Sequence, residues 1–488
     1  MNHTRIVIIG SGTAGLITAL YLNKIDNCSV KVIESSQIGI IGVGEGATEH
    51  WKNDLMNDLM ITDSELIRET GATFKFGIKF ENWNGDNENY FQSIWGHLGQ
   101  KTPEGLPFNI LYRIIKSEIP EHIVQESIRK SIHYKPFDDI SQFHFDTYKL
   151  NDFLKDKCKE KQIQFIDDII EDVKIDEDGY IELLIGRERS HSGDFFVDCS
   201  GFKRVLSNKY NIGWNSYSKY LSMNRAFAFP TEAEKTFNSY TISRSLKNGW
   251  YWKIPTQERV GNGYVYSDKY CDFEDAKQEI EEMLGRGIDV AKSFEFDAGH
   301  LEKTWHKNFV SIGLSGFFIE PLEASSIGTT IKQALSLSNL IVLWDRNNTY
   351  IEDKYNSKMT ELYENILLFV KLHYITKRND TEFWQNEQDM PAPDKLNQII
   401  DIMRENFTNE HMFDYHHGLL FGDFNFAMVM AGLGLFDKQK LLDVYNLQTQ
   451  TIQRNAVLNY QQQEKEFVER EGFSNIESIE SLNRASHI

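Results

Sequence analysis

A glycine-rich turn near the start of the chain constrains the fold more than any other feature. An apolar run, Ile6–Ile9, is followed by Gly10-Ser11-Gly12-Thr13-Ala14-Gly15, and apolar residues then recur at helical spacing up to Leu22. This is G-x-G-x-x-G between a strand and a helix, an arrangement that lets the backbone approach a pyrophosphate at the positive end of the helix. The pattern predicts a dinucleotide-binding βαβ unit, and the alternative is a glycine turn made only for close helix packing.

A carboxylate in the expected place supports the dinucleotide interpretation. The next apolar strand, Ser29–Ile33, ends in Glu34, which lies 19 residues after Gly15, where a carboxylate binds a ribose hydroxyl. The fingerprint alone leaves NAD and FAD open, but no second G-x-G-x-x-G follows a strand. Later strands that end at Gly201 and Gly313 fit a longer cofactor, so FAD is favoured. The cofactor-binding residues expected from this unit are Gly10, Gly12, Thr13, Ala14, Gly15 and Glu34.

The rest of the chain alternates between buried strands and long excursions. Phe195–Gly201 and Phe309–Gly313 are short apolar segments that predict further strands, and Ser325–Trp344 predicts a long helix. A length of 488 residues accommodates two to three domains. We expect an α/β protein with two discontinuous modules: 1–85, 148–206 and 297–348 bind the nucleotide, and 86–147, 207–296 and 349–488 form a helix-rich substrate module.

Composition excludes several classes of function. There are 52 lysines and arginines against 72 aspartates and glutamates, so the formal net charge of −20 disfavours nucleic acid and anionic lipid as partners. No run of 18 apolar residues could span a bilayer. The four cysteines are scattered without a C-x-x-C pair, and the histidines between 411 and 417 lack metal-site spacing, so we expect a cytoplasmic protein without disulfides or a metal.

Two further segments could carry chemistry. In Phe74-Lys75-Phe76-Gly77-Ile78-Lys79-Phe80, a period of two places Lys75, Gly77 and Lys79 on one strand face. From the pattern alone, a half-buried strand with solvated lysines is favoured over a buried, reactive ammonium. After Glu323, a strand gives way to a helix, and the amides near Ser325 and Ser326 could hold a small anion or a flavin oxygen. The alternative is an ordinary helix start.

Together, these segments resemble the flavin-dependent halogenases of the tryptophan halogenase type, from Arg5 to about Phe436. The motifs that occur in the family order are Gly10 to Gly15, Gly42-Val43-Gly44-Glu45, Phe74-Lys75 before Trp83, Asp198-Cys199-Ser200-Gly201-Phe202, W-x-W-x-I-P at Trp250 to Pro255, Phe318 to Ile327, and Leu372-His373-Tyr374. By spacing alone Trp250 to Pro255 is a core strand, but as a motif it is the most diagnostic of the set. The resemblance implies an FAD-binding Rossmann-like body of the aromatic hydroxylase (GR2) type.

The family's chemistry then supplies expected roles. The resemblance implies a two-component enzyme: a separate reductase supplies FADH2, O2 gives a C4a-hydroperoxide, and a bound halide attacks it to form hypohalous acid. Lys75 would hold the oxidant or become halogenated, and Glu323 would assist it. Ser325 and Ser326 would bind the halide. The remaining cofactor contacts implied are Gly44, Glu45, Gly46, Ala47, Asp198, Leu314 and Ile327.

The chain also departs from the family pattern. Its turn is Glu323-Ala324-Ser325-Ser326 where the family has E-S-T-G, so the preferred halide, chloride or a larger one, stays open. Residues 44–48 carry an extra glycine, and 95–98 and 421–434 do not match the family's tryptophan sandwich. We therefore expect halogenation of an indole- or phenol-like small molecule. The alternatives are an FAD-dependent aromatic monooxygenase and a flavin-binding protein without chemistry, and a homodimer is left open.

Overall fold

The computed structural model describes residues 3–42, 46–93, 132–133, 142–236, 238–346, 348–406, 419–437, 439–440 and 473–485. The chain forms two compact units, each assembled from separate segments. Unit 1 contains Met1–Met60, Asp146–Tyr217 and Asp297–Glu364, and unit 2 contains Ile61–Phe145, Ser218–Phe296 and Asn365–Ile488. Residues 61–85, which we grouped with the nucleotide module, cluster with unit 2.

Unit 1 is built on a six-stranded sheet in the order β20-β21-β12-β1-β2-β8. Its strands are β1 Thr4–Ile9, β2 Cys28–Glu34, β8 Gln164–Asp167, β12 Phe195–Asp198, β20 Trp305–His306 and β21 Phe309–Ser311. All neighbours pair in parallel except β20 and β21. Since β1, β12 and β21 are parallel neighbours, their carboxyl ends meet at one edge, where ligands bind in such sheets.

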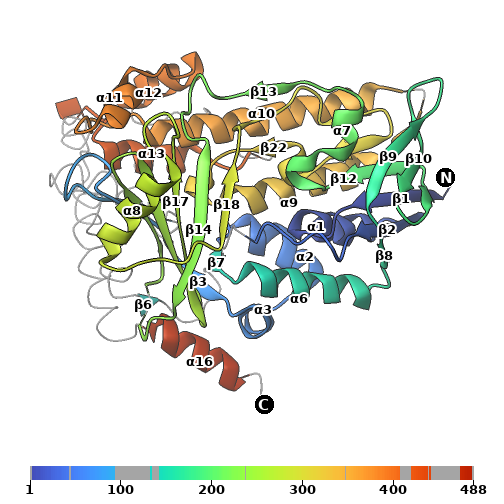
Figure 1. Cartoon of the computed structure of the whole chain (residues 1–488), viewed down its shortest axis with the longest axis horizontal. Helices are drawn as coiled ribbons and strands as arrows, with labels where there is room; N and C mark the ends of the chain where they lie inside the picture. Colours follow the sequence, from blue (N-terminus) through green and yellow to red (C-terminus); the bar gives the residue numbers. More distant parts are fainter. Residues whose placement is uncertain are drawn as a thin grey trace, which may run out of the picture. The chain divides into compact units, whose positions relative to one another are not determined.

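Helices and two small sheets complete unit 1. The helices are α1 Thr13–Leu22, α2 Asn57–Leu59, α6 Thr147–Glu160, α7 Val205–Lys209, α9 Ser325–Ile341 and the first part of α10 Tyr350–His373. The small sheets are β9 Ile170–Ile175, β10 Ile181–Gly186 and β11 Ser190–Ser192, and β13 Trp214–Ser216, β19 Gly299–Leu301 and β22 Phe317–Phe318. Helices α1 and α9 run side by side (Figure 1). The whole of α1 from Gly15 onward is buried.

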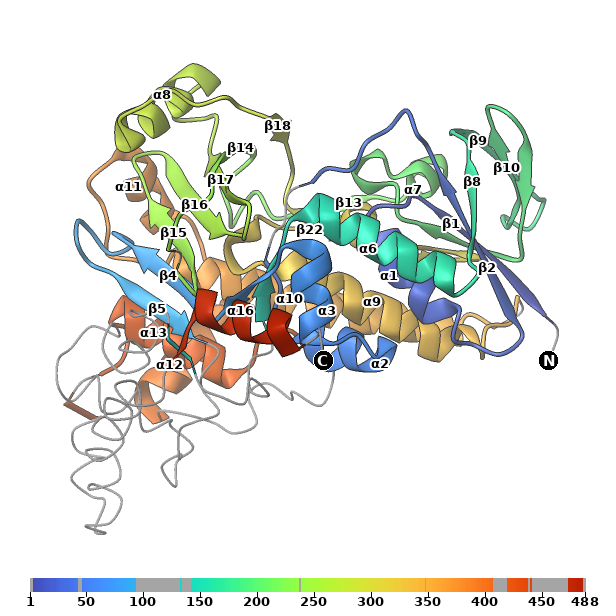
Figure 2. The same ribbon diagram turned by 90° about the horizontal axis from the view of Figure 1, so that it is seen from below.

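Unit 2 is built on a seven-stranded sheet in the order β18-β14-β17-β16-β15-β4-β5, whose strands fan out in Figure 2. Its strands are β4 Gly77–Glu81, β5 Tyr90–Ser93, β14 Arg225–Glu232, β15 Thr241–Ser245, β16 Gly249–Pro255, β17 Arg259–Tyr266 and β18 Lys292–Glu295. Two short ribbons pair β3 Thr73–Lys75 with β7 Gln142–His144 and β6 Ile132–His133 with β23 Phe473–Ser474. The helices are α3 Asp63–Thr70, α8 Phe273–Leu284, the end of α10, α11 Glu382–Asp389, α12 Asp394–Asn406, α13 Asp423–Leu433 and α16 Asn475–Ala485.

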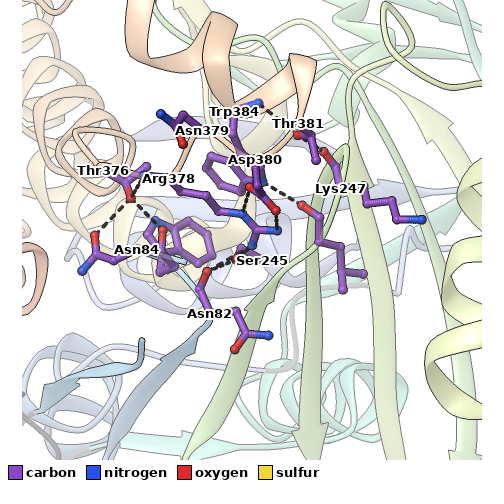
Figure 3. A network of polar contacts seen from close by, with 12 residues as sticks. Asn82, Asn84, Ser245, Lys247, Thr376, Arg378, Asn379, Asp380, Thr381 and Trp384 are labelled. Atoms are coloured by element: carbon purple, nitrogen blue, oxygen red, sulfur yellow. Dashed lines mark hydrogen bonds and ion pairs between the residues drawn. The ribbon is translucent and has the colours of Figure 1, made fainter. Parts of the chain in front are cut away.

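A buried arginine fastens the segment after α10 to the sheet of unit 2 (Figure 3). The Arg378 side chain donates to both carboxylate oxygens of Asp380, to the backbone oxygen of Asn82 and to the Ser245 hydroxyl. Its guanidinium also lies 5.2 Å from the ring centroid of Trp384. A planar guanidinium satisfies all of these acceptors at once, so this side chain helps to hold the segment after His373 in place.

One predicted strand is wrong. The alternating run from Thr73 to Phe80 is divided into β3 and β4, which belong to different sheets. The chain bends because Gly77 has a φ of +147°, which favours glycine, and because the Phe76 amide leaves the ladder to donate to the backbone oxygen of Ser239. The period of two predicted that Lys75 and Lys79 share a strand face. They do not, because they lie on different strands.

Candidate functional site

Of the three fingerprint glycines of unit 1, two meet steric demands of the fold and the third faces open space. Gly10 has a φ of +101°, and a Cβ there would lie 2.5 Å from the backbone oxygen of Cys199. A Cβ on Gly15 would lie 1.9 Å from the backbone oxygen of Gly10, so only glycine lets α1 pack this closely on β1. A Cβ on Gly12, in contrast, would meet nothing within 4 Å. Gly12 is the N-cap of α1, so the open space lies at the start of the helix. A dinucleotide pyrophosphate requires close approach to the backbone at this place.

The start of α1 offers donors to such a group. Gly12 makes no side-chain cap, so the amides of the first turn, including those of Thr13 and Ala14, have no partner within the helix. Both residues are half-buried and thus accessible from one side. The helix dipole adds positive potential at the same place, so the residues present fit a pyrophosphate.

A second turn lies beside this helix start. A Cβ on Gly313, whose φ is +68°, would lie 2.6 Å from Cβ of Ala14. The Gly313 amide donates to Oε1 of Gln333 on α9 at 2.8 Å, which fixes the short 3₁₀ turn Gly313–Ser315 against α9. Leu314 is half-buried at the centre of this turn. The turn at Gly313 and the helix start at Ala14 are about 300 residues apart in the sequence, and the parallel sheet brings them together.

Two predicted cofactor carboxylates have partners in the protein. Both oxygens of Glu34 accept from Nζ of Lys155 on α6, at 2.8 and 2.7 Å. Asp198 is fully buried and accepts from the amide and hydroxyl of Ser200, the amide of Leu206 and the hydroxyl of Ser315. Burial raises the pKa of Asp198, and these hydrogen bonds oppose the rise. In the structure, Asp198 holds the turn after β12 through these hydrogen bonds. Its contact with a cofactor stays a prediction.

The helix start at α9 carries the predicted anion site. Glu323 ends a 3₁₀ turn, Pro321–Glu323, and is 3% exposed. Ala324 follows with a φ of +51°, an uncommon conformation for a residue with a side chain, and α9 begins at Ser325 without a side-chain cap. The Ser325 hydroxyl is buried and makes no hydrogen bond to the described residues. Both interpretations of this helix start, an anion site and an ordinary start that Glu323 and Ser325 only complement, stay predictions.

A second buried carboxylate, which the sequence pattern did not indicate, precedes Glu323. Glu320 is 1% exposed and lies three residues earlier, before Pro321. Its only sequence signal is that the apolar run Phe317–Ile319 leads directly into it. Two buried carboxylates therefore precede the amino terminus of α9.

The other sites predicted in unit 1 are partly described. Ala47 is fully buried, Gly46 is buried, and Ile327 is 7% exposed in the first turn of α9. Gly44 and Glu45 lie outside the described residues.

In unit 2, Lys75 is buried. It is 2% exposed, in contrast to Lys79, whose ammonium pairs with Oε1 of Glu81 at 3.1 Å and keeps contact with solvent. The interpretation of two solvated lysines is therefore wrong for Lys75. Phe74, which precedes it on β3, and Phe76, which follows it, are also buried. The substrate region expected at 95–98 lies outside the described residues, whereas the ring of Phe421 packs 4.1 Å from that of Phe369 in the interior of unit 2.

Unit 1 has the parallel sheet, the glycine turn and the open helix start of an α/β dinucleotide-binding oxidoreductase. Comparison with known proteins specifies this class. The family model described as tryptophan halogenase matches residues 5–446, so the chain belongs to the tryptophan halogenase family and is a flavin-dependent halogenase. This confirms the resemblance and the α/β fold class predicted from the sequence.

Individual relatives match nearly the whole chain. Tryptophan 6-halogenase SttH of Streptomyces toxytricini is 27% identical over 478 residues, covering 89% of this chain and 90% of the relative. The 7-chloro-L-tryptophan 6-halogenase KtzR of a Kutzneria species is 29% identical over 468 residues, covering 88% and 90%. Among solved structures, SttH superposes with a TM-score of 0.89 at 25% identity over 98% of this chain and 100% of that chain. The flavin-dependent halogenase Xcc4156 of Xanthomonas campestris gives 0.88 at 26% identity, with 99% and 98% covered.

Family membership sets the general requirements of the enzyme. Flavin-dependent halogenation uses FAD in its reduced form, O2 and a halide, and the family works with a separate flavin reductase. Within the described ranges, no helix combines the length and apolarity needed to cross a membrane. In the same part of the chain, no cluster of three or more His, Cys, Asp or Glu side chains could hold a metal, and the four cysteines are free. His411, Asp414, His416 and His417 lie outside this part.

Proposed function

We propose that this enzyme halogenates an electron-rich aromatic small molecule, indole- or phenol-like, and that Lys75 transfers the halogen. The observation that carries the proposal is the burial of the Lys75 ammonium, since a surface strand would leave it solvated. Burial of this lysine in a chain of the family supports a role as the halogen-transferring amine. Burial also protects a reactive oxidant from water.

The residues of unit 1 would hold the cofactor. The open space at Gly12 and the first-turn amides of Thr13 and Ala14 fit the FAD pyrophosphate. Glu34, at the end of β2, would accept from the ribose hydroxyls while Lys155 holds its carboxylate in place. Gly46, Ala47, Asp198, Leu314 and Ile327 are the further contacts proposed, together with Gly44 and Glu45.

The amino terminus of α9 would hold the halide. The amides of Ser325 and Ser326 lack partners within the helix, and the buried Ser325 hydroxyl adds a donor. Bound reduced flavin and O2 supply the two-electron oxidation that converts halide to hypohalous acid. The preferred halide depends on the space at Ala324 and Ser326, so chloride, bromide and iodide are all to be tested.

Lys75 would then hold or take the halogen. As an ammonium it donates a hydrogen bond to the oxygen of hypohalous acid and makes the halogen more electrophilic. In the covalent variant, the ammonium gives up a proton, the N–X bond forms as the O–X bond breaks, and the proton joins the departing hydroxide as water, which leaves a positively charged haloamine. Transfer of X⁺ to the ring produces an arenium ion and returns the amine. Glu323 would accept the arenium proton, which restores aromaticity.

The first experiment separates halogenation from its rivals. The full chain is supplied with FADH2 by a flavin reductase, with O2 and with chloride, bromide or iodide, and a panel of indoles and phenols is read by mass spectrometry. Halogenated product supports the proposal. A hydroxylated product without halogen would favour the monooxygenase alternative, and FAD binding without any product would favour a flavin-binding protein.

Lys75→Ala tests the transfer step, with Lys79→Ala as the matched control. Lys79 belongs to the neighbouring strand and is engaged in an ion pair with Glu81. We expect Lys75→Ala to lose at least ~100-fold in turnover and to keep FAD binding, whereas Lys79→Ala should keep both. Unchanged turnover in Lys75→Ala would exclude Lys75 from the mechanism.

Glu323→Gln tests the proposed proton acceptor. The amide keeps the volume of the side chain and removes its basicity, so turnover should fall by about 10²-fold or more while halide and FAD affinities change less. A variant with wild-type turnover would remove Glu323 from the mechanism.

A further inference from the structure

The β3/β7 ribbon of unit 2 has a polar face that is completely buried. The antiparallel register pairs Thr73 with His144, Phe74 with Phe143 and Lys75 with Gln142. Directly opposed residues share a face, and so do residues two apart, so Thr73, Lys75, Gln142 and His144 lie on one face. Their exposed fractions are 0, 2, 5 and 0%. The opposite face carries Phe74 and Phe143, with ring centroids 5.6 Å apart.

The histidine on this face is held from both ring nitrogens. Nε2 of His144 lies 2.8 Å from the Thr241 hydroxyl on β15, and Nδ1 lies 3.5 Å from the Thr73 hydroxyl. Thr73 donates its single hydroxyl proton to the backbone oxygen of Pro255 at 2.8 Å, so towards His144 it can only accept. Nδ1 of His144 therefore carries the hydrogen, and Nε2 accepts from Thr241. Two threonines from different strands thus select one neutral tautomer.

Charge on the face also favours a neutral imidazole. Burial lowers the pKa of His144 well below its usual value, and the positive charge of Lys75 lowers it further. His144 is bonded to residues of β3 and β15. The charged residue of β3 is Lys75. The charged residues of β15 and β16, Arg244 and Lys253, each form an ion pair with a glutamate. The ammonium of Lys75 is therefore the cation that acts on this imidazole.

We propose that His144 is the positioning residue for Lys75: a neutral imidazole with its hydrogen on Nδ1, fixed between Thr73 and Thr241, which keeps Lys75 the single cation of the β3/β7 polar face. A second cation on the same face would repel the ammonium and favour loss of its proton. A freely rotating ring would let β7 shift against β3 and move the ammonium. The hydrogen bonds of Thr73 and Thr241 keep the imidazole neutral and stop it from rotating. The site therefore holds Lys75 in one place and one charge state.

This role deepens the proposed function, because it matters for turnover only if Lys75 transfers the halogen. The tautomer and charge of His144 are nonetheless properties of the protein itself. They can be measured without flavin, halide or substrate, so the two proposals fail separately.

The state of His144 is tested by nuclear magnetic resonance of the full chain labelled with ¹⁵N-histidine, with the His144 signals identified by their loss in His144→Gln. We expect a neutral ring with hydrogen on Nδ1 from pH 6 to 8. An imidazolium, or a ring with its hydrogen on Nε2, would overturn the proposal. Lys75→Met keeps most of the length of the side chain and removes the charge, so it should raise the pH at which His144 is protonated. No change would show that the two groups are not coupled.

The effect on catalysis is tested with His144→Phe and His144→Gln. Phenylalanine keeps a planar ring and loses both hydrogen bonds, so kcat should fall about 10-fold while KM and FAD affinity are kept. Glutamine supplies a donor and an acceptor and should restore kcat to within about 3-fold of wild type. Wild-type kcat in His144→Phe, or no rescue by glutamine, would overturn the role.

A second pair of variants applies if His144→Phe does not fold. Thr241→Val keeps the shape of the side chain and removes the hydroxyl at Nε2, whereas Thr241→Ser keeps the hydroxyl. We expect a mixture of histidine tautomers and lower kcat in Thr241→Val, and neither change in Thr241→Ser. Equal behaviour of the two variants would contradict the proposal. If Lys75→Ala still halogenates while His144 has the expected tautomer, the role of Lys75 fails and the geometry of the face stands.

Discussion

Alanine substitutions at Gly12 and Gly15 should have different effects. Gly12→Ala should weaken cofactor binding, and Gly15→Ala should lower the stability of the fold. Gly12 has a φ of −68° and a ψ of 174°, which any residue adopts, and a Cβ there meets nothing within 4 Å. Gly12→Ala loses up to ~1 kcal/mol because alanine is a poor helix cap, and it gains about 0.4–1 kcal/mol from the lower entropy of the unfolded chain. These terms nearly cancel. The free energy of unfolding should thus change by less than about 1 kcal/mol.

Binding of FAD, in contrast, should be clearly weakened by Gly12→Ala. The new methyl group would occupy the open space in which a pyrophosphate approaches the helix start. We expect FAD to bind at least ~10-fold more weakly, which is about 1.4 kcal/mol. The assay is titration of the ligand-free chain with FAD, followed by flavin fluorescence, beside urea unfolding of the same sample.

Gly15→Ala is the matched control for the same turn. Its Cβ would start 1.9 Å from the backbone oxygen of Gly10 and must reach an ordinary contact of 3.4 Å, so strand and helix must move apart. Overpacking of this kind costs about 1–3 kcal/mol, and stability should fall before any ligand is added. If Gly12→Ala binds FAD as tightly as wild type, the pyrophosphate does not approach Gly12. If Gly15→Ala keeps full stability, the packing argument is refuted.

Two further predictions concern buried charges. Asp54 is partly buried, which alone raises its pKa, but the hydrogen bond from His50 and the charge and hydrogen bond of Lys332 lower the pKa to about 2 from the usual 3.8. Its stabilisation of about 2 kcal/mol is complete above pH ~4 and lost as the pH falls towards 2, so urea unfolding of Asp54→Asn should show a flatter dependence in this range. Lys371 and Glu387 are both buried, with Nζ and Oε2 4.0 Å apart, so Lys371→Met should cost about 3–5 kcal/mol. Adding Glu387→Met should recover most of that loss in a thermal melt, and a double variant no more stable than the single one would contradict this account.

Local patterns predicted the elements whose cause lies within a few residues. The strand, glycine turn and helix from Thr4 to Leu22 form as expected, because Gly10 and Gly15 meet the steric demands of this turn. The start of α3 has a similarly local cause, because the hydroxyl of Thr62 accepts from the amide of Glu65 three residues later. The second strand likewise ends at Glu34. In each case the interactions join residues close in sequence, so their spacing is sufficient evidence.

Patterns failed where a distant partner decided the outcome. An alternating run predicted one strand from Thr73 to Phe80, but pairing with β7 on one side of the bend and with β15 and β5 on the other divided it at Gly77. Glu320 and His144 went unnoticed because a single carboxylate or imidazole has no local pattern, and only burial makes either of them informative.

The sequence by itself determined the chemistry available to this protein: a glycine turn at the start of a helix, a lysine between phenylalanines, and a glutamate before two serines. Those choices follow from local geometry and from the functional groups of the side chains. The tertiary structure decided which of them could act. It buried Lys75 and left Lys79 paired near solvent, and it brought His144 from far along the chain to the face that Lys75 occupies. Burial and strand pairing are set by long-range contacts, and the properties of a buried ammonium depend on those neighbours more than on its own sequence.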